Sequence, residues 1–334
     1  MVPADRPRPP GSPRWLRDGS SRRVAAGSQG LGAPGTRKGD FLQTAYFIHA
    51  LSPLHPGTGQ AVGLVDLPIA RLKATNIPFL PGSSVKGVFR DSFRGAGDES
   101  RELFLAAFGP EPKPEDRDKD HAGAVAFADA RLVLLPVRSL HGTFAYATCP
   151  LLLRLARQDL VSCRVADVPA IPAVAEESAL VTATSRLVPS GISKVFLEDL
   201  DLTSVRGPLA DAWAGALGRW LFPGEEATLA ERLAILDDET MTFLWETGTQ
   251  IDARVRLTKT GVVASKALWY EESLPAETVL VGLASATDSR RAGAPFPAEE
   301  LMAFCLGAAR NDLQFGGKAT VGRGRARLLP VSAN

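Results

Sequence analysis

The sequence has 334 residues and is 45% hydrophobic, which is enough to bury one large core or two small ones. Its 38 basic and 37 acidic side chains nearly cancel, which excludes the uniformly basic surface of a non-specific nucleic-acid binder. No apolar run reaches the roughly 20 residues that cross a bilayer, and the first forty residues lack the apolar centre of a signal peptide. The three cysteines form no CxxC pair, which argues against a disulfide framework and a zinc site. We therefore expect a cytoplasmic protein without membrane contact.

The charge is unevenly distributed along the chain. Residues 1–40 carry eight basic and three acidic side chains, are rich in Gly, Pro, Arg and Ser, and show no apolar period. This composition predicts a disordered basic extension. The remainder carries 30 basic and 34 acidic side chains, so any nucleic-acid binding there requires local rows of cations. We assign residues 41–334 to a single domain.

Strand-like and helix-like segments alternate irregularly after the extension. The periodicity of apolar residues and the turn signals predict strands at 41–50, 124–137, 141–148, 251–257 and 262–270. They predict helices at 82–93, 98–108, 151–160, 209–221 and 298–310. Two extended segments around a Pro-Ser-Gly turn predict a projecting hairpin at 187–202. Because the regular strand–helix repeat of a doubly wound sheet is missing, the fold class is predicted to be α+β with insertions.

One of the expected helices carries a row of cations. Lys86, Arg90 and Arg94 are spaced at i, i+4 and i+8, which places them on one face beside the apolar stripe. Ser83 and Ser84 stand at the start of this helix, where free N–H groups attract phosphate. Two interpretations remain open, namely a cradle for a nucleic-acid backbone and a solvated helix face with a serine cap.

A second basic motif lies near the C-terminus, where residues 316–325 interleave four glycines with three cations. Gly316 and Gly317 allow the backbone to approach a phosphate closely, and Lys318 and Arg323 supply positive charge. The motif differs from a P-loop, because no Gly-Lys-Ser/Thr sequence opens a helix. A tight turn between secondary-structure elements is the alternative interpretation.

The loop-rich segment after the first strand contains His55 and Asp66. Loops after strands often carry functional groups, but the spacing of these two residues does not predict a metal site. An aspartate before Leu-Pro is also common as a turn or cap residue. The sequence shows no GxSxG motif and no order of residues that indicates a hydrolase triad. The residues themselves therefore indicate phosphate binding and say little about catalysis.

Seven segments of the chain carry a resemblance to a known family. They are SPLHPGTG (52–59), GLVDLPIAR (63–71), IPFLPGSSVKGVFR (77–90), LLPVRSLHGTFAYATCPLLL (134–153), SGISKVFLEDLDL (190–202), ALWYEESLP (267–275) and GGKATVGRGR (316–325). Together they resemble the RAMP superfamily of CRISPR proteins, and within it the backbone subunit that cuts target RNA in the type III-B (Cmr) complex. The likeness spans about residues 41–329.

The resemblance implies a modified ferredoxin-like fold, related to the RNA-recognition motif, with a projecting thumb hairpin. Such subunits polymerise head to tail along a CRISPR RNA and hold this guide through its backbone, while base pairing selects the single-stranded target RNA. The implied partners are CRISPR RNA, target RNA, further copies of the chain and the other Cmr-complex subunits. Ser83, Ser84 and Lys86 are then expected to hold the guide.

The resemblance also implies a cleavage site. It makes Asp66 the aspartate needed for cutting, in which a ribose 2′-hydroxyl attacks its own 3′ phosphate with the help of a divalent ion such as Mg²⁺ or Mn²⁺. We expect Asp66 to place the metal, because a carboxylate is a weak base at neutral pH. His55 is expected to assist proton transfer or to contact phosphate, and Tyr270, Glu271 and Glu272 are further catalytic candidates.

Three other functions remain open. The first is a RAMP scaffold that binds guide RNA without cutting, which the sequence context of Asp66 disfavours. The second is the equivalent backbone subunit of the Csm complex, although the segment at 136–150 favours Cmr. The third is a RAMP endonuclease that processes precursor CRISPR RNA without a divalent metal, which a chelator would distinguish.

Overall fold

The computed structural model describes residues 41–58, 65–93, 98–111, 121–291, 293, 295–307 and 312–331. All of these residues belong to one compact unit, residues 39–334. The extension predicted at 1–40 and the cation Arg94 lie outside the described residues. Within the described ranges, no helix is long and apolar enough to span a membrane.

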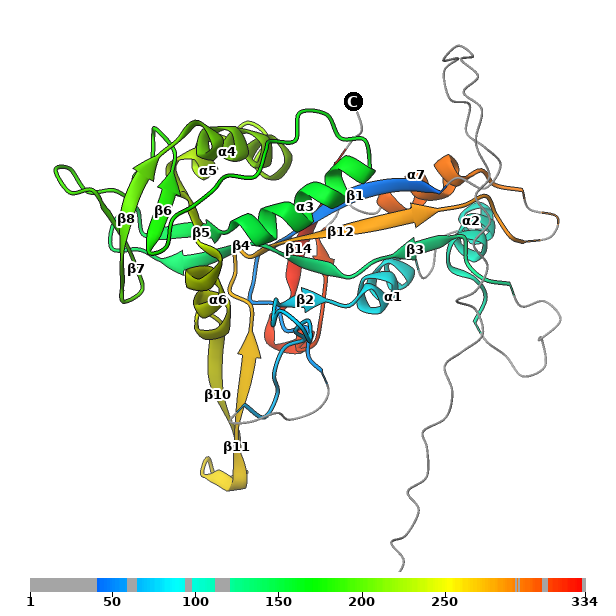
Figure 1. The fold of residues 1–334 in the computed structure, drawn as a ribbon. Coiled ribbons are helices and arrows are strands. Elements are labelled where there is room, and N and C mark those ends of the chain that lie inside the picture. The colour runs from blue at the N-terminus through cyan, green and yellow to red at the C-terminus, as the bar shows by residue number, and fades with distance from the viewer. Residues whose placement is uncertain are drawn as a thin grey trace, which may run out of the picture. The chain divides into compact units, whose positions relative to one another are not determined.

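A large mixed sheet organises the described part of the chain (Figure 1). Its strand order is β13-β14-β1-β12-β4-β5-β9-β6-β8-β7, with β2 paired to β4 and β3 paired to β12. The strands are β1 (Leu42–Ala50), β2 (Phe79–Leu80), β3 (Val125–Phe127), β4 (Ala130–Arg138), β5 (Phe144–Thr148), β6 (Ser178–Val181), β7 (Lys194–Leu197), β8 (Leu200–Arg206), β9 (Leu233–Leu236), β12 (Val279–Ala286), β13 (Leu313–Gln314) and β14 (Arg325–Pro330). Strand β1 pairs antiparallel with both β12 and β14, whereas β5 and β9 are parallel.

Helices pack on both faces of the sheet. They are α1 (Gly82–Ser92), α2 (Asp98–Phe108), α3 (Pro150–Ser162), α4 (Pro208–Leu221), α5 (Ala227–Arg232), α6 (Asp238–Thr247) and α7 (Ala298–Gly307). One apolar core lies under α1, α2, α6 and α7, and a second lies under α4 and α5. Mixed strands and helices of this kind confirm the predicted α+β class.

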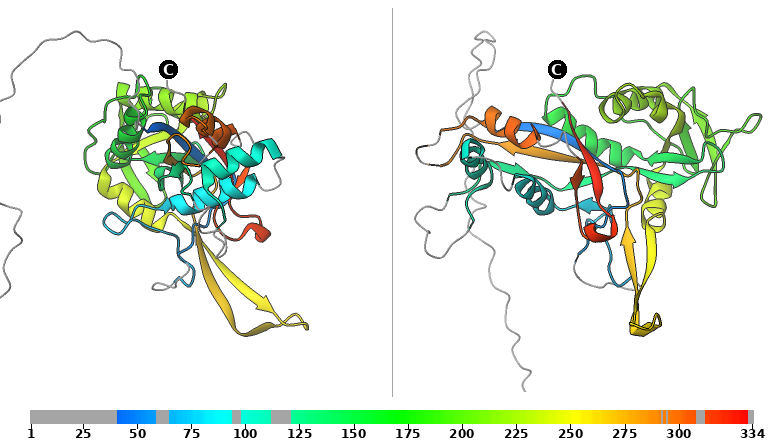
Figure 2. Two further views of the ribbon diagram at one scale, coloured as in Figure 1. Left: turned by 90° about the vertical axis from the view of Figure 1, so that its right-hand side faces the viewer. Right: turned by 180° about the vertical axis from the view of Figure 1, so that it is seen from behind.

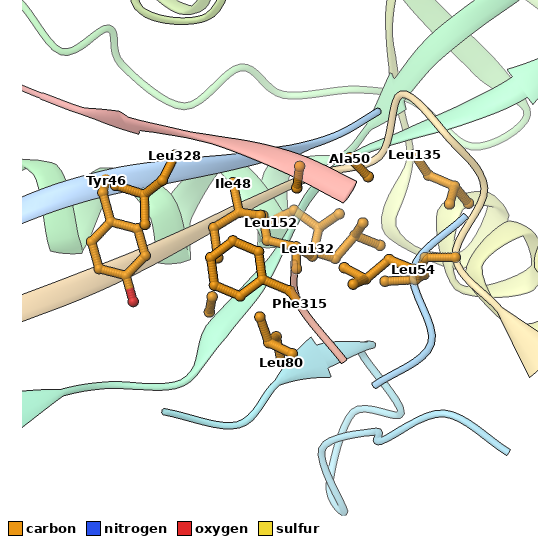
Figure 3. Packing of buried hydrophobic residues seen from close by; sticks show 14 of the residues in the cluster. Tyr46, Ile48, Ala50, Leu54, Leu80, Leu132, Leu135, Leu152, Phe315 and Leu328 are labelled. Carbon is orange, nitrogen blue, oxygen red and sulfur yellow. The ribbon is translucent and has the colours of Figure 1, made fainter. Parts of the chain in front are cut away.

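Strand β1 shows how the sequence divides its side chains between the two cores. Successive side chains of a strand point to opposite faces. Tyr46 and Ile48 accordingly join the first core, where Ile48 lies near Phe315 (Figure 3), while Phe47 joins the second and stacks on Trp220 at 5.8 Å between ring centroids. Because both faces are covered, β1 is apolar almost continuously along its buried half.

The projecting hairpin is not where the sequence predicted it. Strands β10 (Gln250–Leu257) and β11 (Val263–Ser273) form a separate two-stranded sheet that extends away from the large sheet (Figures 1 and 2). The expected hairpin at 187–202 corresponds to β7 and β8, but it turns at residues 198–199 and β8 pairs with β6. This hairpin is therefore the edge of the large sheet, and residues 189–191 precede its first strand.

Other predicted elements agree with the structure apart from their ends. Strands were expected at 251–257 and 262–270 and a helix at 209–221, and these are confirmed as β10, β11 and α4. The strand expected at 124–137 is divided into β3 and β4. The neighbour of β1, strand β12, was not predicted, because a short apolar run does not distinguish a buried strand from a buried helix.

Candidate nucleic-acid interface

A groove of about 570 Å³ separates the exposed side of α1 from two loops. One loop comprises residues 53–58, and the other, which we call the glycine loop, comprises residues 315–324. The groove is lined by Pro56, Gly57, Ser84, Gly87, Val88, Asp91, Ser92, Asp312, Leu313, Gln314, Gly316 and Gly317. With glycines on both sides, backbone forms much of its wall, which suits a ligand that must come close to the main chain.

Helix α1 directs its described cations away from this groove. The Lys86 Nζ donates to Val125 O at 3.2 Å, and burial together with the neighbouring Arg90 charge lowers the pKa of Lys86. The Arg90 Nη1 donates to Phe108 O at 3.4 Å, and its guanidinium lies 5.5 Å from the centre of the Phe104 ring. Lys86 and Arg90 thus share a helix face, as their spacing predicted, but that face packs on β3 and α2.

The start of α1 is only partly open to an anion. Ser83 and Ser84 are both exposed, and Ser84 lines the groove. The first helical amide, Gly82 N, already donates to the carboxylate of Asp129 at 2.8 Å. Glycine is required here, because a Cβ at this position would lie 2.2 Å from Phe127 O. The N-terminal charge of the helix is therefore partly neutralised by the protein itself.

The glycine loop packs directly on residues 53–58. Gly317 N donates to His55 O at 2.9 Å, and Gly324 N donates to Pro53 O at 2.8 Å. Gly316 has φ +72°, and a Cβ there would lie 2.5 Å from His55 O. Glycine is therefore needed at position 316 for two reasons, namely the left-handed backbone and the close contact with residues 53–58.

The two cations expected in the glycine loop form ion pairs with the projecting hairpin. Lys318 Nζ lies 2.8 Å from a carboxylate oxygen of Glu271. Arg323 is only 5% exposed, pairs with Asp252 and donates to Ser273 Oγ at 2.5 Å. These contacts tie the glycine loop to β10 and β11, so both cations have a structural role that the motif did not indicate.

Glu271 is buried within this ion-pair network. Its carboxylate also accepts from Trp269 Nε1 at 2.8 Å and lies 3.4 Å from Arg254 Nε. Burial acts to raise the pKa of Glu271, but the hydrogen bonds from Lys318 and Trp269 outweigh it and hold the pKa below its ordinary value. Glu271 is thus a charged anchor beneath the surface.

Glu272 is a second buried anchor, with both carboxylate oxygens hydrogen-bonded. One oxygen accepts from Arg71 Nη2 at 2.6 Å and from Thr249 Oγ1 at 2.9 Å, and the other accepts from Ile69 N at 3.0 Å. Arg71 also donates to Trp245 O at 2.9 Å. The segment that follows Asp66 is therefore held against β11 and the end of α6.

Asp66 itself is exposed and stands beside β11. Its Oδ2 accepts from the backbone N–H of Tyr270 at 2.8 Å, and the adjacent Leu67 N donates to Tyr270 O at 3.1 Å. The Tyr270 side chain is 41% exposed. A carboxylate held at one oxygen and open to solvent can contact a substrate or a metal ion.

His55 connects the groove to this cluster. Its side chain is buried, and Nδ1 lies 2.6 Å from the backbone oxygen of Glu272. Gly57, two positions after His55, pairs in an isolated bridge with Ile69, which lies three positions after Asp66. The fold thus gathers His55, Asp66 and the 270–272 segment, all predicted as site residues, at the base of the hairpin.

The described residues contain no group of three His, Cys, Asp or Glu side chains that could hold a metal ion. Asp66 still fits Mg²⁺ or Mn²⁺ as a single carboxylate ligand, because these ions commonly keep several waters and use substrate phosphate oxygens. Glu271 and Glu272 are committed to cationic partners and are not free ligands. The fit is therefore to a metal shared between protein, water and substrate.

Sequence reasoning missed the partners that hold this cluster. Arg71, Thr249, Asp252 and Ser273 are the residues that anchor the predicted ones. Arg71 and Glu272 are 201 positions apart, so no local spacing relates them. The available signal was an arginine within the segment GLVDLPIAR, one of those that carry the family resemblance, and its partner was not apparent.

Residues 47–327 match the family model described as the RAMP superfamily. The chain belongs to the RAMP superfamily. It is 30% identical over 288 residues to the "CRISPR system Cmr endoribonuclease Cmr4" of Pyrococcus furiosus, which covers 84% of this chain and 93% of that relative. Both the predicted family and its predicted fold are thereby confirmed.

Solved structures show the same RAMP fold. The crystal structure of oligomeric Cmr4 from Pyrococcus furiosus has a TM-score of 0.68 and 25% identity, and the match covers 88% of this chain and all (100%) of that chain. The cryo-EM structure of the type III-B Cmr-beta complex bound to cognate target RNA contains a chain with a TM-score of 0.65 and 20% identity, matched over 86% of this chain and 96% of that one.

Proposed function

We propose that this RAMP protein is a guide-RNA-binding backbone subunit of a type III-B CRISPR effector complex and that it cuts complementary target RNA. The observation that carries the proposal is the exposed Asp66 carboxylate, held by Tyr270 N at the base of the hairpin. The relative named as a Cmr endoribonuclease supports the cutting activity, since this chain spans 93% of it. The non-cutting scaffold gives no reason to fix an exposed carboxylate at this position.

The cleavage step follows from the chemistry of RNA. A ribose 2′-hydroxyl attacks the adjacent 3′ phosphate in line with the leaving 5′ oxygen, which gives a 2′,3′-cyclic phosphate and a free 5′-hydroxyl. Asp66 orients the reacting groups, and His55, whose Nδ1 lies 2.6 Å from Glu272 O, is a candidate for moving a proton. A divalent ion, Mg²⁺ or Mn²⁺, bound at Asp66 supplies stabilisation of the negative charge that develops on the phosphate. Tyr270 lies beside Asp66 and is suited to contact the target strand.

Glu271 and Glu272 act differently from Asp66 in this proposal. Both are buried and bound to cations or donors, so they position the cleavage segment and the glycine loop without touching substrate. Fixing a catalytic group through buried neighbours is worth a large part of the rate, because small displacements weaken the reacting geometry.

The guide is proposed to lie in the groove between α1 and the glycine loop. Ser84, Gly316 and Gly317 line it and are suited to contact the sugar–phosphate backbone. Ser83 stands exposed at the start of α1. Lys86 and Arg90 lie on the face of α1 that packs on β3 and α2, so they add positive charge to the helix without lining the groove. In this arrangement base pairing, not the protein, selects the target.

The proposal includes assembly. Copies of the chain are expected to align head to tail along one guide, together with the other Cmr-complex subunits, in the cytoplasm. The hairpin of β10 and β11 is the proposed thumb, because it forms a separate two-stranded sheet that extends away from the large sheet (Figure 1). The relative whose crystal structure is described as oligomeric supports self-association.

The decisive experiment is a reconstitution with a guide and a labelled complementary RNA. Cutting at regular intervals in Mg²⁺ or Mn²⁺, stopped by EDTA, supports the metal-dependent slicer. Binding of guide and target RNA without cutting favours the non-cutting scaffold. Cutting of the guide precursor that EDTA does not stop indicates the processing endonuclease. Short RNAs of uniform 5′ sequence that co-purify with the chain would support guide binding independently of cleavage.

A further inference from the structure

The edge of the His55 ring lies behind two glycines that line the groove. A Cβ at Gly57 would lie 2.6 Å from His55 Nε2, and a Cβ at Gly317 would lie 3.3 Å from His55 Cδ2. Both glycines belong to the groove wall. His55 as a whole is 5% exposed. Because both of these wall residues are glycines, neither places a side chain over the Nε2–Cδ2 edge of the ring.

The hydrogen bond on the other side of the ring determines what Nε2 offers. Nδ1 lies 2.6 Å from Glu272 O, and a carbonyl oxygen only accepts, so Nδ1 carries the proton. In the neutral ring Nε2 is then an acceptor with a free lone pair. Among the described residues, no side chain or backbone group hydrogen-bonds to Nε2. An acceptor without a protein partner, directly behind two glycines of the groove wall, is available to a donor from the ligand.

The proposed ligand of the groove, a ribonucleotide backbone, has one such donor. Its phosphate oxygens and ring oxygen only accept, whereas the ribose 2′-hydroxyl both donates and accepts. We infer that His55 Nε2 accepts a hydrogen bond from a guide 2′-hydroxyl and thereby makes the groove selective for RNA over DNA. Base amino groups also donate, but reading them would restrict the guide sequence. The inference rests on the proposed guide-binding function, and it assigns the free nitrogen of His55 to the guide in place of proton transfer.

Nucleic-acid analogues isolate this contact. The full-length protein is titrated with one single-stranded RNA and with the same sequence carrying 2′-fluoro or 2′-deoxy sugars throughout. Fluorine keeps the RNA-like sugar pucker but cannot donate, so a difference between RNA and the 2′-fluoro strand reports the lost donor. One hydrogen bond corresponds to a preference of roughly 2- to 10-fold per contact.

Three variants separate the imidazole edge from the rest of the site. His55→Asn places an amide donor near Nδ1 and keeps the bond to Glu272 O, but removes Nε2. Gly57→Ala keeps the imidazole and covers its edge. Gly307→Ala is the control, because this glycine belongs to α7, does not line the groove, and a Cβ there meets nothing within 4 Å.

We expect the wild type and Gly307→Ala to prefer RNA over the 2′-fluoro strand. His55→Asn and Gly57→Ala should bind both strands equally. Because a Cβ at Gly57 would lie 2.6 Å from His55 Nε2, the thermal unfolding of each variant is recorded beside its binding as the check on folding. An RNA preference that survives in both His55→Asn and Gly57→Ala overturns the 2′-hydroxyl assignment while guide binding stands. A preference that follows base sequence overturns it in favour of base recognition. A wild type that binds none of the strands overturns the guide-binding function itself.

Discussion

Asp66 Oδ2 accepts a 2.8 Å hydrogen bond from the backbone N–H of Tyr270, 204 positions further along the chain. The contact involves one carboxylate oxygen and leaves the residue exposed. The donor is a backbone N–H, which every substitution of Tyr270 except proline preserves, so the carboxylate is held by the hairpin strand itself. This geometry makes the charge of Asp66, and not its shape, the quantity to test.

Asp66→Asn should abolish target cleavage and leave guide and target binding intact. The amide keeps an oxygen that can accept from Tyr270 N but lacks the charge that a metal ion requires. We expect the single-turnover rate to fall by at least about 100-fold, in the range of lost acid–base or charge catalysis. Asp201→Asn is the control, because Asp201 forms an exposed ion pair with Lys194 on the β7–β8 hairpin. Undiminished cutting by Asp66→Asn would shift the catalytic role to His55 or Tyr270.

The pair of Arg71 and Glu272 should be important for stability as well as cleavage. Their side chains are 16% and 8% exposed, and removing one partner of a buried ion pair destabilises by about 3–5 kcal/mol. Arg71→Met and Glu272→Gln should each lower the unfolding free energy, and the double variant should lose less than the sum. Breaking the exposed Lys194–Asp201 pair should change stability by about 1 kcal/mol or less. Chemical denaturation of the four proteins measures the coupling, and strict additivity would contradict it.

Glu271 should make stability depend on pH in the acid range. Its pKa in the folded state lies below the ordinary value of 4.5. The stabilisation is therefore fully present above about 4.5 and is lost as the pH falls through the lower, folded-state pKa. Urea unfolding from pH 6 downwards should show this loss in the wild type and a flatter profile in Glu271→Gln. An equally steep profile in Glu271→Gln would assign the acid sensitivity to other carboxylates.

Gly316→Ala should weaken guide retention and destabilise the glycine loop. The backbone there is left-handed, and a Cβ would lie 2.5 Å from His55 O. Gly191→Ala provides a matched control, since its φ is +79° and a Cβ there meets nothing within 4 Å. The control includes the backbone strain of about 1–2 kcal/mol without the steric clash. We expect Gly316→Ala to lose more stability and more guide binding than Gly191→Ala, as measured by thermal unfolding and filter binding. Equal losses in the two variants would mean that backbone strain alone explains the effect and that the contact with His55 O is unimportant.

Much of the fold could be predicted from local patterns. Helices α3 and α4 and strands β1, β10 and β11 follow from apolar periodicity over a few residues, and the segments that carry the family resemblance contain every residue now proposed for the site. The sequence therefore indicated the α+β class and the family, and through the family resemblance it indicated His55 and Asp66 as candidate site residues.

The tertiary structure decided which side chains face one another. Lys86 and Arg90 were correctly placed on one helix face, but the packing of α1 on β3 and α2 turns that face from the groove. Likewise β10 and β11, not the segment at 187–202, extend from the large sheet. Periodicity reports only the direction of a side chain relative to its own element, because it depends on chain neighbours. The contacts of Glu272 with Arg71 and of Asp66 with Tyr270 join segments about 200 positions apart, and only the tertiary fold brings such segments together.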